Sequence, residues 1–470
     1  MTKSIGLPLW LVIVGGALAL WSLLHILILP AIRWFFRRRT KKTLIKIDER
    51  LDLRLPDFKL TKRREIINRL VYDTKVQQAL EAFAKEQDVS HTNALKKVKK
   101  YAHEIVPSFN ALVYFRFGNW VSRTVCRMLY RVRVGFVDEE AFKKVDPQSS
   151  VVFIMNHRSN IDYILLGYLT ISRVALSFAV GEWARVWPLQ QLLRALGGFF
   201  VRRGSGNPLY RRVLERYIQM ATEGGVVQAV FLEGKLSKDG RLGQPKIGIL
   251  DYMLRTFEPN KGRDLVFVPV GINYDRVLED RSSLLSIDPD TSKKKKTDVI
   301  KTSSLYLLKT IRLRLRRGWY RYGYAVVNFG TPISMRAYAK EHNLNFLNLN
   351  KEERIQKVET LAQDLMTAVG QIVPVVPVAL IASVFLEDPE KNFSELELKT
   401  RVQHKIDRLE ECCAAVYIPR SDHDYAIEVG LRTLILRHIV LEEDDLYYAA
   451  PGETKILQYY ANSIVHLFES

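Results

Sequence analysis

An apolar run near the start of the chain limits what this sequence can fold into. The 25 residues from Ile5 to Leu29 carry no formal charge, and at about 1.5 Å per helical residue such a helix exceeds a hydrocarbon core about 30 Å thick. We therefore expect one N-terminal transmembrane helix. A helix lying in the membrane surface is the alternative. A cleaved secretory signal is disfavoured, because the run continues for ten residues past the small residues Ala17 and Ala19.

Basic residues directly after the run indicate its orientation. The cluster consists of Arg33, Arg37, Arg38, Arg39, Lys41 and Lys42. The positive-inside rule places such a cluster in the cytoplasm, so we expect a protein of the cell membrane with the rest of the chain on the cytoplasmic side. The three cysteines, Cys126, Cys412 and Cys413, lack metal-ligand spacing, which predicts neither a disulfide framework nor a zinc site.

The charge balance points to anionic partners. The chain has 71 Lys and Arg against 51 Asp and Glu, a formal net charge of +20, which favours phospholipid headgroups, nucleic acid or phosphorylated metabolites. The run from Lys309 to Tyr324 mixes basic and aromatic residues. Such a mixture is typical of an anionic membrane surface or of nucleic-acid binding, and solvated cations on an edge strand and helix are the alternative. Because the chain already carries an apolar anchor, we expect a membrane surface and no nucleic acid.

The pattern of apolar residues divides the chain into four regions. We expect a membrane anchor helix with a basic flank at 1–39, a helical region at 40–145, an α/β domain at 146–350 and a C-terminal helical region at 351–470. Four β-rich runs alternate with helical stretches in the third region: Val151–Met155, Val226–Phe231, Leu265–Val270 and Tyr324–Phe329. This alternation predicts a mostly parallel sheet. Pro374 and Pro377 interrupt a later apolar segment, which is too short for a second span.

A histidine and an aspartate follow the first of these runs. His157 and Asp162 stand just past its carboxyl end, where open α/β sheets bind their ligands. An aspartate at the start of the next helix can orient the imidazole and support its positive charge, which leaves the other ring nitrogen to accept a proton. The pair is thus a candidate general base. A histidine capping a helix beside an aspartate is the structural alternative.

Five sequence blocks carry a resemblance to a known family. They are NHRSNIDY (Asn156–Tyr163), GGFFVRR (Gly197–Arg203), FLEGKLSKDGR (Phe231–Arg241), VPVGINYDRV (Val268–Val277) and LQYYANSIVHLF (Leu457–Phe468). In order and spacing they resemble the glycerolipid acyltransferase family, in its glycerol-3-phosphate and dihydroxyacetone-phosphate branch. The resemblance implies an α/β acyltransferase domain with a mostly parallel central sheet, flanked by helical N- and C-terminal regions.

The resemblance also implies a reaction. A membrane-bound enzyme of this family would transfer a fatty acyl group from acyl-CoA or acyl carrier protein to the sn-1 hydroxyl of glycerol 3-phosphate, which gives lysophosphatidic acid. His157 would be the general base and Asp162 would orient it, while the turn at Glu233 and Gly234 would offer backbone donors to the oxyanion. No metal or redox cofactor is expected. Lysophosphatidic acid, dihydroxyacetone phosphate or another lysolipid is the alternative acceptor, and a non-catalytic membrane adaptor or an RNA-binding protein is a third interpretation.

Basic residues within the blocks are the candidates for binding the phosphorylated acceptor. The set implied by the resemblance is Arg158, Arg202, Arg203, Lys235, Ser237, Lys238 and Arg276. Arginine forks suit phosphate better than lysine does. The third block departs from the family pattern Glu-Gly-Thr-Arg-Ser-Arg or Glu-Gly-Gly-Arg-Ser-Arg, because Leu236 and Lys238 replace its two arginines. This departure leaves the identity of the acceptor open.

Overall fold

The computed structural model describes residues 56–171, 174–202, 204–285 and 322–469. The expected membrane helix at Ile5–Leu29 and most of the basic run from Lys309 lie outside these residues. Within the described ranges, the helices are too short or too polar to cross a bilayer.

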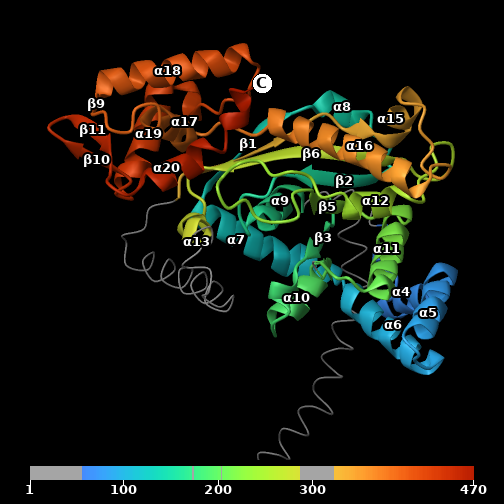
Figure 1. Ribbon diagram of the computed structural model, residues 1–470. Helices are drawn as coiled ribbons and strands as arrows, with labels where there is room; N and C mark the ends of the chain where they lie inside the picture. Colours follow the sequence, from blue (N-terminus) through green and yellow to red (C-terminus); the bar gives the residue numbers. More distant parts are fainter. Residues whose placement is uncertain (1–55, 172–173, 203, 286–321, 470) are drawn as a thin grey trace, which may run out of the picture.

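An eight-stranded sheet forms the centre of the molecule (Figure 1). Its strands are β1 (Arg131–Val137), β2 (Ser150–Met155), β3 (Ser177–Val180), β4 (Gly198–Phe200), β5 (Gln228–Phe231), β6 (Leu265–Tyr274), β7 (Tyr324–Phe329) and β8 (Ile333–Ser334). Seven of them lie in the order β1-β7-β6-β2-β5-β3-β4, and β8 pairs with β6. The strands from β6 to β4 run parallel, whereas β7 and β8 are antiparallel to β6 and β1 runs parallel to β7. The predicted mostly parallel α/β sheet is confirmed.

Helices cover both faces of this sheet. The N-terminal helical elements are α3 (Asp57–Leu60), α4 (Arg63–Val71), α5 (Thr74–Glu86), α6 (His91–Ile105), the π-helical segment η2 (Val113–Gly118), α7 (Asn119–Leu129) and α8 (Glu139–Lys143). Those between and after the strands are α9 (Asp162–Thr170), η3 (Glu182–Ala184), α10 (Leu189–Ala195), α11 (Pro208–Glu223), α12 (Gly248–Leu254), α13 (Asp280–Leu285), α15 (Met335–Glu341) and α16 (Lys351–Gln371). In Figure 1, α16 lies above the sheet and α7 and α9 lie below it.

Alternating side chains of β2 divide the core into two clusters. Phe153 and Met155 pack with α7 and α9, whereas Val152 and Ile154 pack with α11, α12 and α16. Successive residues of a strand point to opposite faces, so a sheet that is covered on both sides needs an almost continuous apolar sequence. The central strand β6 meets this need, because all ten of its residues are buried.

The C-terminal part adds helices and a small second sheet. Its elements are α17 (Pro377–Phe385), β9 (Phe393–Ser394), α18 (Glu395–Glu411), η4 (Pro419–Ser421), α19 (His423–Ile435), β10 (Val440–Glu443), β11 (Leu446–Ala449), α20 (Thr454–Ala461) and η5 (Val465–Leu467). The apolar helix α17 begins at Pro377, a favourable first helical position, and it packs against α18, α19 and α20.

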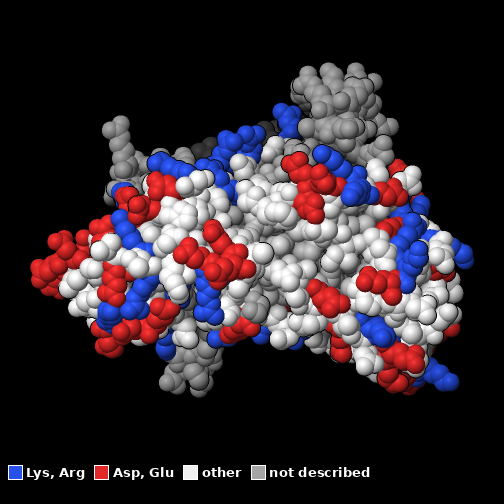
Figure 2. All heavy atoms as spheres, turned by 90° about the horizontal axis from the view of Figure 1, so that it is seen from above, with Lys and Arg blue, Asp and Glu red and all other residues white. Residues whose placement is uncertain are grey.

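Two regions predicted as helical also contain strands. Strand β1 lies within 40–145, and the antiparallel sheet β10-β11-β9 lies within 351–470. Most residues of β1 are exposed, and its one partner among the described strands is β7, nearly 200 residues later in the sequence. Its partner is therefore invisible to local periodicity. The acidic residues of the β10–β11 hairpin form the red tip in Figure 2, while acidic and basic residues are interspersed over the rest of that face.

Candidate active site

The register of the parallel strands brings the first and third sequence blocks together. Met155 at the end of β2 pairs with Phe231 at the end of β5 and with Val270 of β6. The residues that follow β2 and β5 therefore emerge side by side at the carboxyl edge of the sheet. The Asn156 side chain fixes this exit, because it donates to Ile272 O and accepts from Ile272 N, both at 2.8 Å.

A buried carboxylate holds the His157 ring. The Nδ1 atom of His157 lies 3.0 Å from Oδ2 of Asp162, the first residue of α9. The same oxygen accepts the backbone N–H groups of Arg158 at 2.8 Å and Ser159 at 2.9 Å, and Oδ1 accepts the Tyr274 hydroxyl at 2.6 Å. Four donors thus immobilise a carboxylate with no exposed surface, and the carboxylate fixes the imidazole.

Aromatic packing fixes the plane of the same ring. Phe231 stacks on the imidazole of His157 with 3.7 Å between the ring centres and an angle of 3° between the planes. The proton on Nδ1 that the Asp162 contact requires leaves the lone pair on Nε2. That nitrogen has no hydrogen-bond partner among the described residues. The arrangement can therefore accept a proton at Nε2 and stabilise the resulting imidazolium.

Glu233 braces the backbone around His157. Its Oε1 accepts the His157 N–H at 2.8 Å and its Oε2 accepts the Gly243 N–H at 2.9 Å. Burial raises the pKa of the Glu233 carboxyl, and the two backbone donors oppose this shift. The next residue, Gly234, has a φ of +68°, a conformation that favours glycine, and its N–H donates to Phe231 O at 3.1 Å within the turn.

The loop after this turn closes over the backbone of His157. The Ser237 N–H donates to His157 O at 3.0 Å, while its hydroxyl donates to Arg241 O at 2.8 Å. Ser237 is buried, whereas Lys235 and Lys238 are exposed. Of the three predicted phosphate-binding residues in this loop, Ser237 holds the loop in place and the two lysines lie at the surface.

Arg158 points toward the C-terminal part of the chain. It is only 3% exposed, its Nη1 donates to Gly240 O, and its guanidinium carbon lies 4.9 Å from the centre of the Tyr459 ring. Among the residues that the structure describes, its Nε and Nη2 atoms have no hydrogen-bond partner. The side chain therefore links the first block to the third block and to α20, and it keeps two unpaired donors.

Arg202 forms an ion pair with an N-terminal helix. Its Nε and Nη2 donate to the two carboxylate oxygens of Glu104 in α6, at 2.8 and 2.6 Å, and its guanidinium lies over the rings of Tyr101 and Tyr210. Two strands separate β4, which precedes Arg202, from β2, a separation of about 14 Å at normal strand spacing. Its neighbour in the predicted set, Arg203, lies outside the described residues.

Arg276 follows β6 at the same edge of the sheet. Its guanidinium carbon lies 3.9 Å from the centre of the Tyr322 ring, and its backbone oxygen accepts the Tyr130 hydroxyl at 2.8 Å. It has no carboxylate partner among the described residues. Within the described parts of the chain, no hydrogen bond joins Arg202 or Arg276 to the loop of His157.

Sequence reasoning missed three residues that position the site. Tyr274 and Phe231 contact the His157–Asp162 pair directly. Glu279 accepts the Ser159 hydroxyl at 2.7 Å and the Asn160 side-chain amide at 3.0 Å, and burial raises its pKa. All three lie in or next to the quoted blocks, but their contacts follow from strand register, which single-block patterns do not contain.

The chain is similar in sequence to known acyltransferases. The acyltransferase family model matches residues 133–273, and the model of the glycerol-3-phosphate acyltransferase C-terminal region matches residues 303–470. The glycerol-3-phosphate acyltransferase of Alteromonas mediterranea is 29% identical over 428 residues, which cover 87% of this chain and 50% of the relative. That of Xanthomonas campestris pv. campestris is 29% identical over 425 residues, which cover 87% of this chain and 46% of the relative. The chain thus spans about half the length of these relatives.

One solved structure, the 1-acyl-sn-glycerophosphate acyltransferase of Thermotoga maritima, aligns with 62% of this chain and 93% of its own, at 16% identity and a TM-score of 0.30. The two family models match successive parts of the chain: the first contains the first three sequence blocks and the start of the fourth, to residue 273, and the second contains the fifth block. These matches place an acyltransferase-family domain at residues 133–273 and a region similar to the C-terminal region of the glycerol-3-phosphate acyltransferases at residues 303–470.

Proposed function

We propose that this chain transfers a fatty acyl group from acyl-CoA or acyl carrier protein to the sn-1 hydroxyl of glycerol 3-phosphate, which gives lysophosphatidic acid. The observation that carries the proposal is the His157–Asp162 pair, whose Nδ1 and Oδ2 atoms lie 3.0 Å apart at the carboxyl edge of the sheet. The family relationship favours this reaction. The relatives are roughly twice as long as this chain, so the activity is tested on this chain itself.

In the proposed mechanism His157 activates the acceptor alcohol. An alcohol is a poor nucleophile near neutral pH, whereas a thioester already has a good leaving group, so deprotonation during attack is the main task. Nε2 takes the hydroxyl proton while the alcohol oxygen bonds to the thioester carbonyl carbon. The carbon–sulfur bond of the tetrahedral intermediate then breaks, and the imidazolium returns the proton to the departing thiolate. Asp162 stabilises the positive charge that exists between these two transfers.

Asp162 has a second role, because it sets the tautomer of the base. A carboxylate opposite Nδ1 keeps the proton on that nitrogen. Its other contacts, with Tyr274 and with two backbone N–H groups, hold the carboxylate at the helix start. The imidazole therefore needs no reorientation before it accepts the proton.

We assign the acceptor phosphate to cations at the same edge of the sheet. Arg276 is the foremost candidate, because its guanidinium stacks on a ring and keeps its donors for a ligand. Lys235 and Lys238 are exposed on the adjacent loop. Arg202 would have to exchange its bidentate contact with Glu104 for the phosphate. Arg158 and Arg203 complete the proposed set, and Ser237 keeps the loop in place.

The proposed location follows from the sequence. We infer that the N-terminal run Ile5–Leu29 anchors the chain in the cell membrane and that the catalytic domain faces the cytoplasm, because the basic cluster follows the run. A protease-protection assay on sealed membranes with an antibody against the C-terminus tests this orientation.

A screen of acceptors tests the reaction. Purified full-length chain receives radiolabelled acyl-CoA together with glycerol 3-phosphate, dihydroxyacetone phosphate, lysophosphatidic acid or another lysolipid, and the lipid products are separated. We expect labelled lysophosphatidic acid from glycerol 3-phosphate. Because Leu236 replaces a family arginine, product from a different acceptor would redirect the proposal within the family. Absence of product from every acceptor and from both acyl donors would contradict it.

A further inference from the structure

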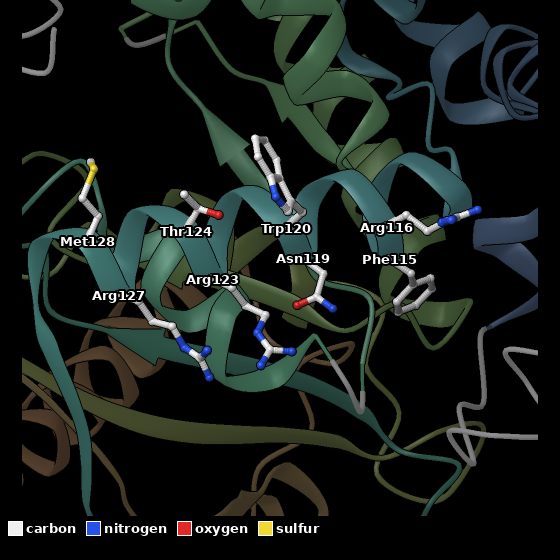
Figure 3. Close-up of a pocket in the computed structure, with 8 residues that line it drawn as sticks. All are labelled: Phe115, Arg116, Asn119, Trp120, Arg123, Thr124, Arg127 and Met128. Carbon is white, nitrogen blue, oxygen red and sulfur yellow. The ribbon is translucent and has the colours of Figure 1, made fainter. Parts of the chain in front are cut away.

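A wide hollow runs along the π-helical segment η2 and helix α7, on the lower side of the molecule in Figure 1 (Figure 3). Its volume is about 810 Å³. Its lining includes Arg116, Trp120, Arg123 and Arg127. The opposite side of α7 packs against α9, the helix that starts at Asp162. The hollow is therefore a surface feature, separated from the His157 site by two packed helices.

The exposed side of η2 and α7 carries arginines and aromatic rings together. Arg116, Trp120, Arg123 and Arg127 are exposed and recur at helical spacing. Trp120 is 63% exposed, and its ring centre lies 6.1 Å from that of Phe117, which is 43% exposed. In Figure 3, Arg123 and Arg127 project side by side from one edge of α7, whereas Trp120 projects from the other edge.

The charge of this segment has one sign. Residues 105–137 contain five arginines and neither Asp nor Glu. Within the described parts of the chain, Arg116, Arg123 and Arg127 have no ion-pair or hydrogen-bond partner. The face shown in Figure 2 differs, because acidic and basic residues are interspersed there. An unpaired cationic stripe is electrostatically complementary to an anionic surface.

A second exposed tryptophan extends this surface. Trp187 is 77% exposed and Val186 is 56% exposed, directly before α10. Leu196, the residue after α10, packs against Gly118, the residue before α7. Its Cδ2 atom lies 2.9 Å from the position that a Cβ atom would occupy on Gly118. Figure 1 shows α10 below α7 on the same side of the molecule. Exposed tryptophans beside arginines are typical of protein at the lipid headgroup level.

We propose that this surface, which we call the α7 face, docks onto the anionic phospholipid headgroups of a membrane. The arginines contact the lipid phosphates while Trp120 and Trp187 enter the interfacial layer. An acidic protein would satisfy the arginines but not the separately exposed apolar side chains, so a lipid surface fits both features. The inference is independent of the proposed reaction, because it concerns lipid contact and its test measures no turnover.

The test reads lipid contact at one position of the full-length chain. Total binding to vesicles does not discriminate, since the run Ile5–Leu29 is expected to hold the chain on its own. A nitroxide is therefore attached at Thr124 after Thr124→Cys, in a background where the exposed Cys412 and Cys413 are changed to serine; Cys126 is buried. The matched control carries the label at Thr400, an exposed threonine of α18 on the upper side of the molecule.

Collisions of the label with oxygen and with a water-soluble nickel complex are measured in reconstituted vesicles. Moving from phosphatidylcholine to mixed phosphatidylcholine and phosphatidylglycerol should lower nickel collisions and raise oxygen collisions at position 124 but not at position 400. Equal water exposure at both positions in the anionic vesicles would overturn the proposal. Protection at position 124 that requires an added acidic protein would also overturn it.

Charge variants test the role of the arginines. Changing Arg116, Arg123 and Arg127 to glutamine should lower the ratio of lipid-contacting to water-exposed label about five-fold for each arginine removed. The control removes the same charge from exposed lysines on the upper side: Lys143, Lys144 and Lys357. It should leave the ratio unchanged. Equal effects of the two triple variants would refute docking through the α7 face. Acyl transfer measured in detergent tests the proposed reaction separately, because no vesicle is present.

Discussion

Replacing Asp162 by asparagine should slow acyl transfer without unfolding the site. The carboxylate Oδ2 accepts three N–H contacts and Oδ1 accepts one hydroxyl. The amide oxygen of asparagine can take the place of Oδ2, and its NH2 group can donate to Tyr274, whose oxygen is able to accept. The variant thus keeps the shape and the hydrogen bonds, and it loses the negative charge opposite the imidazolium of His157.

The structure gives the size of this effect. Loss of one partner of a buried ion pair costs about 3–5 kcal/mol, and each ~1.4 kcal/mol changes a rate tenfold. Because His157 is charged only after it has taken the proton, Asp162→Asn should lower kcat by about 100- to 4,000-fold and leave both KM values nearly unchanged. The assay follows release of the thiol from acyl-CoA with glycerol 3-phosphate as acceptor. An unchanged kcat, or a change confined to KM, would refute the orienting role, provided that the melting temperature matches that of the wild type.

Three further predictions concern the end of β6 and the two residues that follow it. Tyr274→Phe removes the hydroxyl that Asp162 accepts at 2.6 Å and should lower kcat about 10- to 100-fold. The double variant with Asp162→Asn should lose little more of kcat than Asp162→Asn alone. Fully additive losses would indicate that the two residues act independently. Arg276→Ala should raise the KM for glycerol 3-phosphate but not for acyl-CoA, and equal effects on both would indicate a structural role. Burial raises the pKa of Asp275 from 3.8 to about 6. Between these pH values the folded state therefore binds more protons than the unfolded state. The contribution of Asp275 to the free energy of unfolding falls as pH rises from about 4 to about 6. Asp275→Asn should remove this pH dependence, which amounts to about 3 kcal/mol. Denaturant titrations at several pH values measure it. A variant whose unfolding free energy changes with pH as steeply as that of the wild type would contradict the assignment.

Local patterns predicted the strands that are rich in residues favouring β-structure and that have clear boundaries. Strand β7 has the predicted limits Tyr324–Phe329, and β2 begins one residue before the predicted Val151. Strands β3 and β4 have four and three residues, too few for a periodicity to appear. Strand β1 was missed for a different reason, because it is an exposed edge strand whose pairing with β7 is set by the fold.

The candidate site was predictable where its contacts are local. His157 and Asp162 are five residues apart on one loop, so the sequence alone predicted their contact. Phe231 and Tyr274 reach the same pair from other strands, and strand register decides which residues meet. The ion pair of Arg202 with Glu104 joins residues 98 positions apart, and no pattern in the second block could reveal it.

Substitution of His157 by alanine tests the central claim most directly. With full-length chain, acyl-CoA and glycerol 3-phosphate, the initial rate of lysophosphatidic acid formation should fall by about 100- to 10,000-fold, the contribution expected of a positioned general base. Formation of lysophosphatidic acid at the wild-type rate by a correctly folded His157→Ala protein would contradict the account.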